Sequence, residues 1–201
     1  MNQRNVYELF PDPIFHYKLE NYKQINKELL NYILELQKKD KKGNNRSNRG
    51  GWHSPNFDLV NPGPPINFIN SFKDFLKHII EDEIGWEYIP NKQRVVAMWA
   101  IINKKNSYNV KHNHQNCYLS SAYYIKKPEN SGDITFYDPK ESKTYRFPEV
   151  EKHTNYSAES VTIKPEEGDL LIFPSYLYHD VGVNLSDEER VVVSFNIDIG
   201  Y

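Results

Sequence analysis

Apolar residues recur at helical spacing in two stretches of the first half of the chain. The first stretch predicts a helix over residues 22–39 capped by Asn21, and the second predicts a helix that begins after residues 61–65 and stops before Gly85. Their apolar stripes are Ile25, Leu29, Tyr32, Ile33 and Leu36, and Ile69, Phe72, Leu76 and Ile79. Residues 6–19 are apolar and aromatic with two prolines, so we expect an extended piece or an edge strand there.

From residue 95 onward the pattern changes to short apolar runs that are separated by turn residues. These runs predict strands over residues 95–102, 118–125, 133–137, 160–163, 170–173, 178–183 and 191–199. Many short strands at this spacing are typical of a sandwich, jelly roll or barrel. We therefore expect one α+β domain over residues 1–201, in which an N-terminal strand and two supporting helices (residues 1–90) pack on a jelly-roll core (residues 91–201).

Composition and charge narrow the class of protein. The 201 residues are 38% hydrophobic and 14% aromatic, which suffices for a core and argues against disorder. The single cysteine, Cys117, excludes an internal disulfide and a CxxC zinc site. A net charge of −2 gives no support to a nucleic-acid partner. Because no apolar run reaches the roughly 18 residues of a membrane span and residues 1–10 carry no secretory signal, we expect a soluble cytoplasmic protein.

Two histidines at alternate positions form the first candidate for chemistry. On a strand, His112 and His114 would point to the same face, with Asn116 beside them. Neutral imidazole is the commonest protein ligand for iron, zinc and copper, but an isolated His-x-His pair is a weak signal. A third histidine, His179, follows a buried strand and strengthens the case for a metal site.

Arginine is scarce, since the chain has 19 lysines and only six arginines. One of them, Arg190, opens an apolar strand and shares its face with Val192, Ser194 and Asn196. A buried arginine needs an anionic partner, because burying the charge unpaired is very costly. The partner is either a ligand or one of the acidic residues 187–189 at the mouth of the strand.

The order His-x-His, several strands, His and then Arg resembles the Fe(II)/2-oxoglutarate oxygenase superfamily. The chain looks most similar to the bacterial and phage group of 2OG-Fe(II) oxygenases related to prolyl 4-hydroxylases. The supporting segments are residues 47–54, 103–114, 119–125, 131–139, 168–175 and 179–196. The resemblance covers essentially the whole chain and is strongest over residues 99–196.

This resemblance implies a double-stranded β-helix, which is a cupin-like jelly roll, with a metal site near one mouth. In the superfamily, two histidines and one carboxylate hold Fe(II) and leave positions for 2-oxoglutarate and O₂. His112 matches the first histidine and His179 the distal one, so the carboxylate position falls on His114. We expect a triad of three histidines, and two alternatives stay open: His114 is not a ligand, or His114 is the first ligand and Asn116 replaces the carboxylate. Because histidine ligands must be neutral, metal affinity is expected to fall below about pH 6.5.

The resemblance also implies residues that bind the co-substrate. Arg190 matches the residue that anchors 2-oxoglutarate, because its planar fork suits a carboxylate. Tyr124 matches a tyrosine that often bonds the same carboxylate, whereas alternation along the strand turns Tyr123 toward the core. Ser194 is expected to line the same pocket, and Tyr118 to touch co-substrate or substrate.

The implied activity is that of a 2-oxoglutarate-dependent non-haem iron dioxygenase. Such an enzyme converts 2-oxoglutarate and O₂ to succinate and CO₂, with ascorbate as the reductant in vitro. The expected substrate is a prolyl residue in a peptide or protein, or a free amino acid. Residues 38–49, which are polar and basic, are expected to form a mobile loop and, with residues 50–55, a lid over the substrate. A homodimer is left open.

Two other functions are compatible with the same residues. A cupin-type metal-dependent dioxygenase or isomerase that does not use 2-oxoglutarate fits a three-histidine set better, but it gives Arg190 no task. A non-catalytic binding module would hold the same histidines as ordinary pocket residues.

Overall fold

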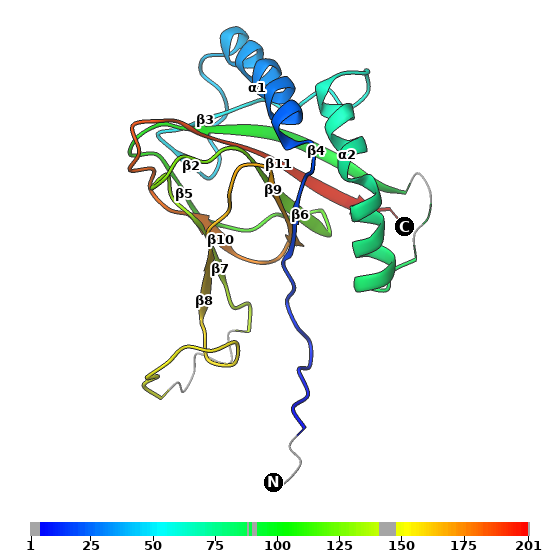
Figure 1. Cartoon of the computed structure of the whole chain (residues 1–201), viewed down its shortest axis with the longest axis vertical. Coiled ribbons are helices and arrows are strands. Elements are labelled where there is room, and N and C mark those ends of the chain that lie inside the picture. Colours follow the sequence, from blue (N-terminus) through cyan, green and yellow to red (C-terminus); the bar gives the residue numbers. More distant parts are fainter. Residues whose placement is uncertain (1–4, 88, 90–91, 141–147, 201) are drawn as a thin grey trace.

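The computed structural model of the chain describes residues 5–87, 89, 92–140 and 148–200. Two sheets of antiparallel strands enclose a cavity, and two helices cover the outer face of the larger sheet (Figure 1). This arrangement confirms the predicted α+β jelly roll with supporting helices.

The larger sheet has the strand order β1-β9-β6-β11-β4-β3. Its strands are β1 (Phe15–Lys18), β9 (Asp169–Pro174), β6 (Leu119–Lys126), β11 (Arg190–Ile199), β4 (Gln93–Asn103) and β3 (Trp52–His53). The smaller sheet has the order β2-β5-β10-β7-β8. Its strands are β2 (Asn48–Arg49), β5 (Tyr108–His112), β10 (His179–Val181), β7 (Ile134–Tyr137) and β8 (Ser160–Ile163).

All seven strands predicted from residue 95 onward are present. Residues 38–49 are predicted as a loop, and residues 40–47 do form a connection without helix or strand, whereas Lys38 and Lys39 end the first helix and Asn48–Arg49 form β2. Strand β2 pairs with β5, and β3 pairs with β4. The Trp52 indole donates a hydrogen bond of 2.8 Å to the carbonyl oxygen of Asp40. Residues 1–90 therefore contribute three strands to the two sheets, not one.

The two helices begin and end close to the predicted residues. Helix α1 covers Tyr22–Lys39, and α2 covers Pro64–His78 before a single π-helical turn, η1 (Ile79–Glu83). Asn21 occupies the N-cap position of α1, but its side chain makes no capping hydrogen bond, so its predicted role as a cap is wrong. Across the described residues, no helix is both long enough and apolar enough to cross a membrane.

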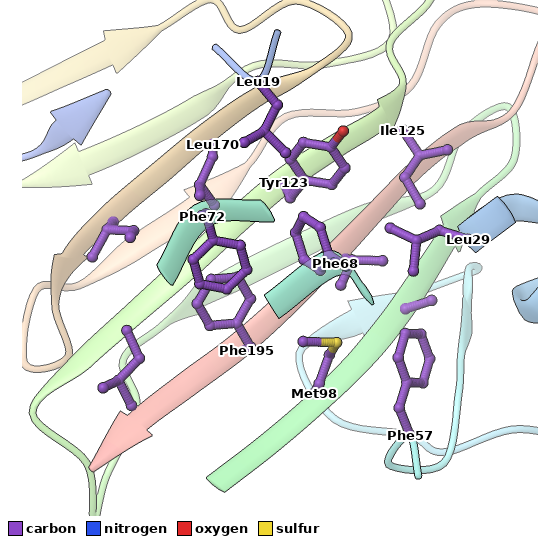
Figure 2. Packing of buried hydrophobic residues seen from close by; sticks show 14 of the residues in the cluster. Leu19, Leu29, Phe57, Phe68, Phe72, Met98, Tyr123, Ile125, Leu170 and Phe195 are labelled. Carbon is purple, nitrogen blue, oxygen red and sulfur yellow. The ribbon is translucent and has the colours of Figure 1, made fainter. Parts of the chain in front are cut away.

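Side chains of the central strands alternate between two apolar layers. On one face of the larger sheet, Phe72 of α2 stacks on Phe195 of β11 with ring centroids 4.8 Å apart, and Phe68 lies edge-on to Phe72 at 5.0 Å (Figure 2). On the other face, Tyr124 and Val192 belong to a second buried cluster that also includes residues of the smaller sheet. Burial on both faces fixes the register of these strands, because a slip of one residue would exchange the two sets of side chains.

A buried polar bridge joins the first helix to the larger sheet. The Tyr123 hydroxyl donates a hydrogen bond of 2.6 Å to the side-chain oxygen of Asn26 in α1. The Asn26 amide in turn donates to the carbonyl oxygen of Ile125 at 2.9 Å. Tyr123 and Tyr124 are adjacent in β6, yet they belong to opposite faces of the sheet, as alternation predicted.

Replacing the inner hydroxyl of this bridge should destabilise the fold without touching the cavity. In Tyr123→Phe, the buried oxygen of Asn26 loses its donor, so we expect the free energy of unfolding in urea to fall by about 1–3 kcal/mol. Tyr124→Phe removes the same atom from the next residue and is the matched control. An equal loss of stability in both variants would contradict the assignment of the two rings to opposite faces.

Candidate active site

A cavity of about 670 Å³ opens between the two sheets. Residues of β4, β6, β9 and β11 line it on one side and residues of β5, β7 and β10 on the other. All three histidines of the sequence motif face it, as do Arg190, Tyr124 and Ser194.

Strand pairing brings the first two histidines together. His112 ends β5 and His179 begins β10, and the two residues lie directly opposite each other in the antiparallel ladder. Their ring centroids are 4.4 Å apart. Residues 67 positions apart in sequence thus share one face of the smaller sheet.

His114 reaches the same place by a different route from the one expected. Strand β5 ends at His112, so His114 does not continue the strand. Its backbone amide instead donates to the carbonyl oxygen of Ser175 at 2.9 Å. Its ring nevertheless lies 5.3 Å from that of His112 and 5.2 Å from that of His179. One ligand atom from each of the three histidines lies within 4.8 Å of the others, which is a spacing that one metal ion can bridge.

Hydrogen bonds fix the tautomer of each ring. Nδ1 of His112 lies 2.8 Å from the carbonyl oxygen of Val110, and Nδ1 of His179 lies 3.0 Å from that of Leu177. Since a carbonyl oxygen only accepts, Nδ1 carries the proton and the lone pair of Nε2 is available to a metal. This arrangement is the one that histidine ligands in metal sites usually show.

The larger sheet holds the third ring. Nδ1 of His114 lies 2.7 Å from the side-chain oxygen of Asn196, and the Ser120 hydroxyl lies 2.9 Å from the same nitrogen. The Ser120 hydroxyl also donates to the Asn196 oxygen at 3.0 Å. Asn196 and Ser120 come from β11 and β6, so the histidine cluster connects both sheets.

Burial keeps all three imidazoles neutral. It lowers the pKa of His179 to about 3 and that of His114 to about 4, with the neighbouring imidazoles adding to the effect. The pKa of His112 is also lowered, again mainly by burial. Protons therefore compete with a metal only at a lower pH than the value of about 6.5 expected from the sequence.

Arg190 is buried at the start of β11, with 1% of its surface exposed. Its Nη1 donates hydrogen bonds to the carbonyl oxygens of Ser131, Gly132 and Gly182. In the described part of the chain, no carboxylate forms an ion pair with it, so the predicted alternative of a partner among residues 187–189 is not seen. A buried guanidinium that is held only by neutral oxygens remains a binding site for an anion.

Gly132 makes room for this guanidinium. Its φ of +87° lies in the left-handed region, and a Cβ there would lie 2.6 Å from Nη1 of Arg190 and would clash with the carbonyl oxygen of Gly182. The Ser131–Gly132 turn therefore serves to hold Arg190 in place.

Two of the other predicted co-substrate residues line the same cavity as Arg190, and one does not. Tyr124 is 1% exposed and Ser194 is 8% exposed, and both line the cavity. Burial raises the pKa of the Tyr124 phenol, and the charge of Arg190 opposes this shift. Tyr118 lies outside the cavity wall, with its ring 43% exposed and packed edge-on against Trp86 at 5.8 Å. The expectation that Tyr118 touches a ligand here is therefore not supported.

The structure adds cavity residues that the sequence did not single out. Asn196 had been placed on the face of Arg190, but its contact with His114 had not been foreseen. His53 and Arg46 also line the cavity, and both come from the segment around β2 and β3. Asn116 is exposed and does not line the cavity, which removes the alternative in which it replaces a carboxylate ligand.

The residues present fit a divalent metal and a small dicarboxylate. Three neutral imidazoles with free Nε2 atoms suit iron, zinc, copper or nickel. A buried guanidinium that forms no ion pair within the described residues and a buried phenol near it suit a carboxylate. Both groups line the same cavity.

Comparison with protein families gives one match. Residues 97–196, about half of the chain, match the family described as "Putative 2OG-Fe(II) oxygenase". The curated proteins gave no match.

Solved structures of similar fold cover nearly the whole chain. A prolyl-4-hydroxylase from Pseudomonas putida is 10% identical, with a TM-score of 0.64 over 93% of this chain and 92% of that one. A prolyl hydroxylase from Trichoplax adhaerens, solved with a peptide fragment of hypoxia inducible factor, is 15% identical, with a TM-score of 0.62 over 92% and 83%. HygX from Streptomyces hygroscopicus, solved with nickel, 2-oxoglutarate and hygromycin B, is 12% identical, with a TM-score of 0.59 over 93% and 83%.

These proteins share the jelly roll, and the family match spans the segment from β4 to β11 that carries the three histidines and Arg190. The chain therefore belongs to the 2-oxoglutarate- and Fe(II)-dependent oxygenases.

Proposed function

We propose that the chain, acting as one oxygenase unit, hydroxylates a prolyl residue in a peptide or a free amino acid, with conversion of 2-oxoglutarate and O₂ to succinate and CO₂. One observation carries the proposal: three neutral histidines share a cavity with a buried arginine that forms no ion pair within the described residues. A metal would bind to the three histidines, and a dicarboxylate would supply the anion for the arginine.

The three histidines would hold Fe(II) through Nε2. The carbonyl oxygens of Val110 and Leu177 orient His112 and His179, and Asn196 and Ser120 orient His114. Such outer contacts fix the ring orientation and raise the basicity of the ligand atom. When bound, the iron supplies the activation of O₂ that couples decarboxylation of 2-oxoglutarate to oxidation of the substrate.

Arg190 would hold the distal carboxylate of 2-oxoglutarate. Its guanidinium is already oriented by three carbonyl oxygens, so little conformational entropy remains to be lost on binding. Tyr124 would donate its phenolic proton to the same carboxylate, because burial keeps the phenol protonated at neutral pH. Ser194 lies on the same face of β11 and would line the pocket. Apolar residues of the second cluster exclude water from this end of the cavity.

The choice of substrate rests on likeness to other proteins. Two of the solved structures above are prolyl hydroxylases, and one of these was solved with a peptide fragment. HygX was solved with hygromycin B, which shows that this fold also accepts small molecules. Both a peptidyl proline and a free amino acid are therefore retained.

A three-histidine set also favours a second candidate, a cupin-type dioxygenase or isomerase that does not use 2-oxoglutarate. The two candidates differ in the task of Arg190, which only the first requires.

Loss of a ligand should abolish metal binding. We expect His112→Ala and His179→Ala to lose stoichiometric iron or nickel, because two ligands remain for a site that needs three. His114→Ala should weaken nickel binding at least 100-fold, whereas His114→Asp should retain it. Metal content and nickel titration calorimetry measure these effects. His53→Ala is the control, because it removes a histidine of the same cavity that lies outside the triad. Retained metal in His114→Ala would show that only two histidines coordinate.

Nickel affinity should depend little on pH near neutrality. The lowered pKa values mean that His114 and His179 have already lost their protons at pH 6, and the pKa of His112 is lowered in the same direction, so protons compete little with the metal above that pH. We expect the affinity to change less than about threefold between pH 7.5 and 6.0, whereas three imidazoles with a pKa of 6.5 would lose about fiftyfold. Calorimetry at three pH values, corrected for buffer ionisation, decides between these outcomes.

Arg190 should control 2-oxoglutarate binding. Arg190→Lys keeps the charge but loses the planar fork, so we expect the Kd of 2-oxoglutarate to rise at least tenfold and succinate formation to fall with it. Calorimetry on the manganese-loaded protein gives the Kd, and thermal melting shows that the fold is intact. Arg94→Lys, on the exposed surface of β4, is the control. If the wild-type protein neither binds 2-oxoglutarate nor forms succinate, the cupin-type candidate replaces the proposal.

A further inference from the structure

Within the described residues, the charged side chains that line the cavity are all positive. In the part of the chain that the structure describes, 23 residues line it, and the charged ones among these are two arginines, Arg46 and Arg190, with no aspartate or glutamate. The whole chain has only six arginines, against 19 lysines. The proposed function gives one of the two cavity arginines a task and leaves the other unexplained.

Arg46 lies where the cavity opens to solvent. Its backbone amide donates to the side-chain oxygen of Asn48 at 2.9 Å, and its carbonyl oxygen accepts from Nη1 of Arg49 at 3.0 Å. Asn48 starts β2, so the backbone of Arg46 is tied to the edge of the smaller sheet. Its side chain is exposed, and no acidic group or hydrogen-bond acceptor is recorded for its guanidinium within the described ranges.

The two arginines occupy different parts of the cavity wall. Arg190 is buried on β11 of the larger sheet, whereas Arg46 precedes β2 at the edge of the smaller sheet. The distal carboxylate of 2-oxoglutarate binds to one guanidinium group. The guanidinium of Arg190 takes this carboxylate, because this guanidinium is buried away from water. Arg46 therefore remains available to a second anion.

An aromatic surface connects Arg46 with the histidine cluster. His53 lines the cavity and stacks on Trp99, with ring centroids 5.7 Å apart and planes 7° from parallel. Trp99 in turn lies 5.6 Å from the ring of His114. Burial lowers the pKa of His53, and the nearby charge of Arg46 lowers it further, so His53 is neutral and adds no second positive charge.

We propose that Arg46 binds an anionic group, a carboxylate or a phosphate, of the primary substrate, and that the body of this substrate lies against Trp99 and His53 next to the histidine cluster. The inference rests on the proposed function and narrows it. A cavity of about 670 Å³ lies in the range that encloses drug-sized ligands, so it accommodates a second small molecule beside 2-oxoglutarate. A free amino acid carries a carboxylate for Arg46, whereas an internal prolyl residue of a peptide does not.

Three small probes test the subsite on the protein loaded with manganese and 2-oxoglutarate. Benzoate and phenyl phosphate carry the anion on a flat ring, and benzamide is the neutral analogue of benzoate. Manganese at the histidine cluster enhances the proton relaxation of any probe that enters the cavity, so NMR titration gives both location and Kd. Arg46→Gln is compared with Arg94→Gln, which removes the same charge from the outside of β4.

We expect benzoate or phenyl phosphate to show saturable relaxation enhancement, with a Kd at least tenfold lower than that of benzamide. Arg46→Gln should raise the Kd of the anionic probe at least tenfold, and Arg94→Gln should change it less than twofold. The stronger of the two anionic probes identifies carboxylate or phosphate as the group recognised.

Several results would overturn the inference. Equal binding of benzoate and benzamide, or equal binding to the wild-type protein and Arg46→Gln, would show that no anion subsite exists. An equal loss of 2-oxoglutarate affinity in Arg46→Gln and Arg190→Gln would assign Arg46 to the co-substrate instead. If manganese or 2-oxoglutarate does not bind to the wild-type protein, the proposed function fails and the subsite with it, whereas a loaded protein that ignores the anionic probes overturns the subsite alone.

Discussion

Alternation of side chains along most of β6 and β11 lets the larger sheet contribute to two layers. Odd-numbered residues such as Tyr123 and Phe195 pack under the helices, and even-numbered residues such as Tyr124 and Arg190 face the cavity. The helix-facing layer supplies apolar burial that fixes the register. Because register is fixed there, the backbone of the polar residues on the opposite face is held in position, and hydrogen bonds such as those of Arg190 then orient their side chains.

The smaller sheet supplies the remaining half of the site, and besides the apolar cluster that both sheets share, two kinds of connection join it to the larger sheet. The first is the chain itself, since β2 and β3 follow each other in sequence but belong to different sheets. The second is the contact of His114 with Asn196 and Ser120. Paired strands form most of the wall of this cavity, and the short segments around Arg46 and His114 complete it, which keeps its polar groups in defined orientations.

Much of this arrangement could be predicted from the sequence, and the exceptions have physical causes. Helix α1 and the seven later strands follow from periodicity, and parity along β11 placed Arg190 and Ser194 together. Strands β2 and β3 have two residues each, which is too short for any period to appear. Tyr118 has the parity of Ser120, but it precedes β6, so alternation does not govern its side chain.

The histidine cluster also has features that local sequence patterns cannot predict. Spacing brought His112 and His114 together on an assumed strand, yet His114 reaches the site through a hydrogen bond to Ser175 after the strand has ended. Its contact with Asn196 joins residues 82 positions apart, and local pattern carries no signal for such a pair. The pKa shifts depend on burial by the complete fold and are not visible from residue types.

Within the described residues, the histidine cluster contains no carboxylate, which has a consequence for how the metal and 2-oxoglutarate are taken up. Three neutral ligands leave a divalent ion with its full charge, and the two carboxylates of 2-oxoglutarate would balance that charge within one cavity. The bound metal would then raise the affinity of the protein for 2-oxoglutarate, and bound 2-oxoglutarate would raise its affinity for the metal, because binding free energies are linked reciprocally. In the proposed enzyme, metal and co-substrate would therefore be taken up cooperatively, and the concentration of 2-oxoglutarate would set how firmly the metal is retained.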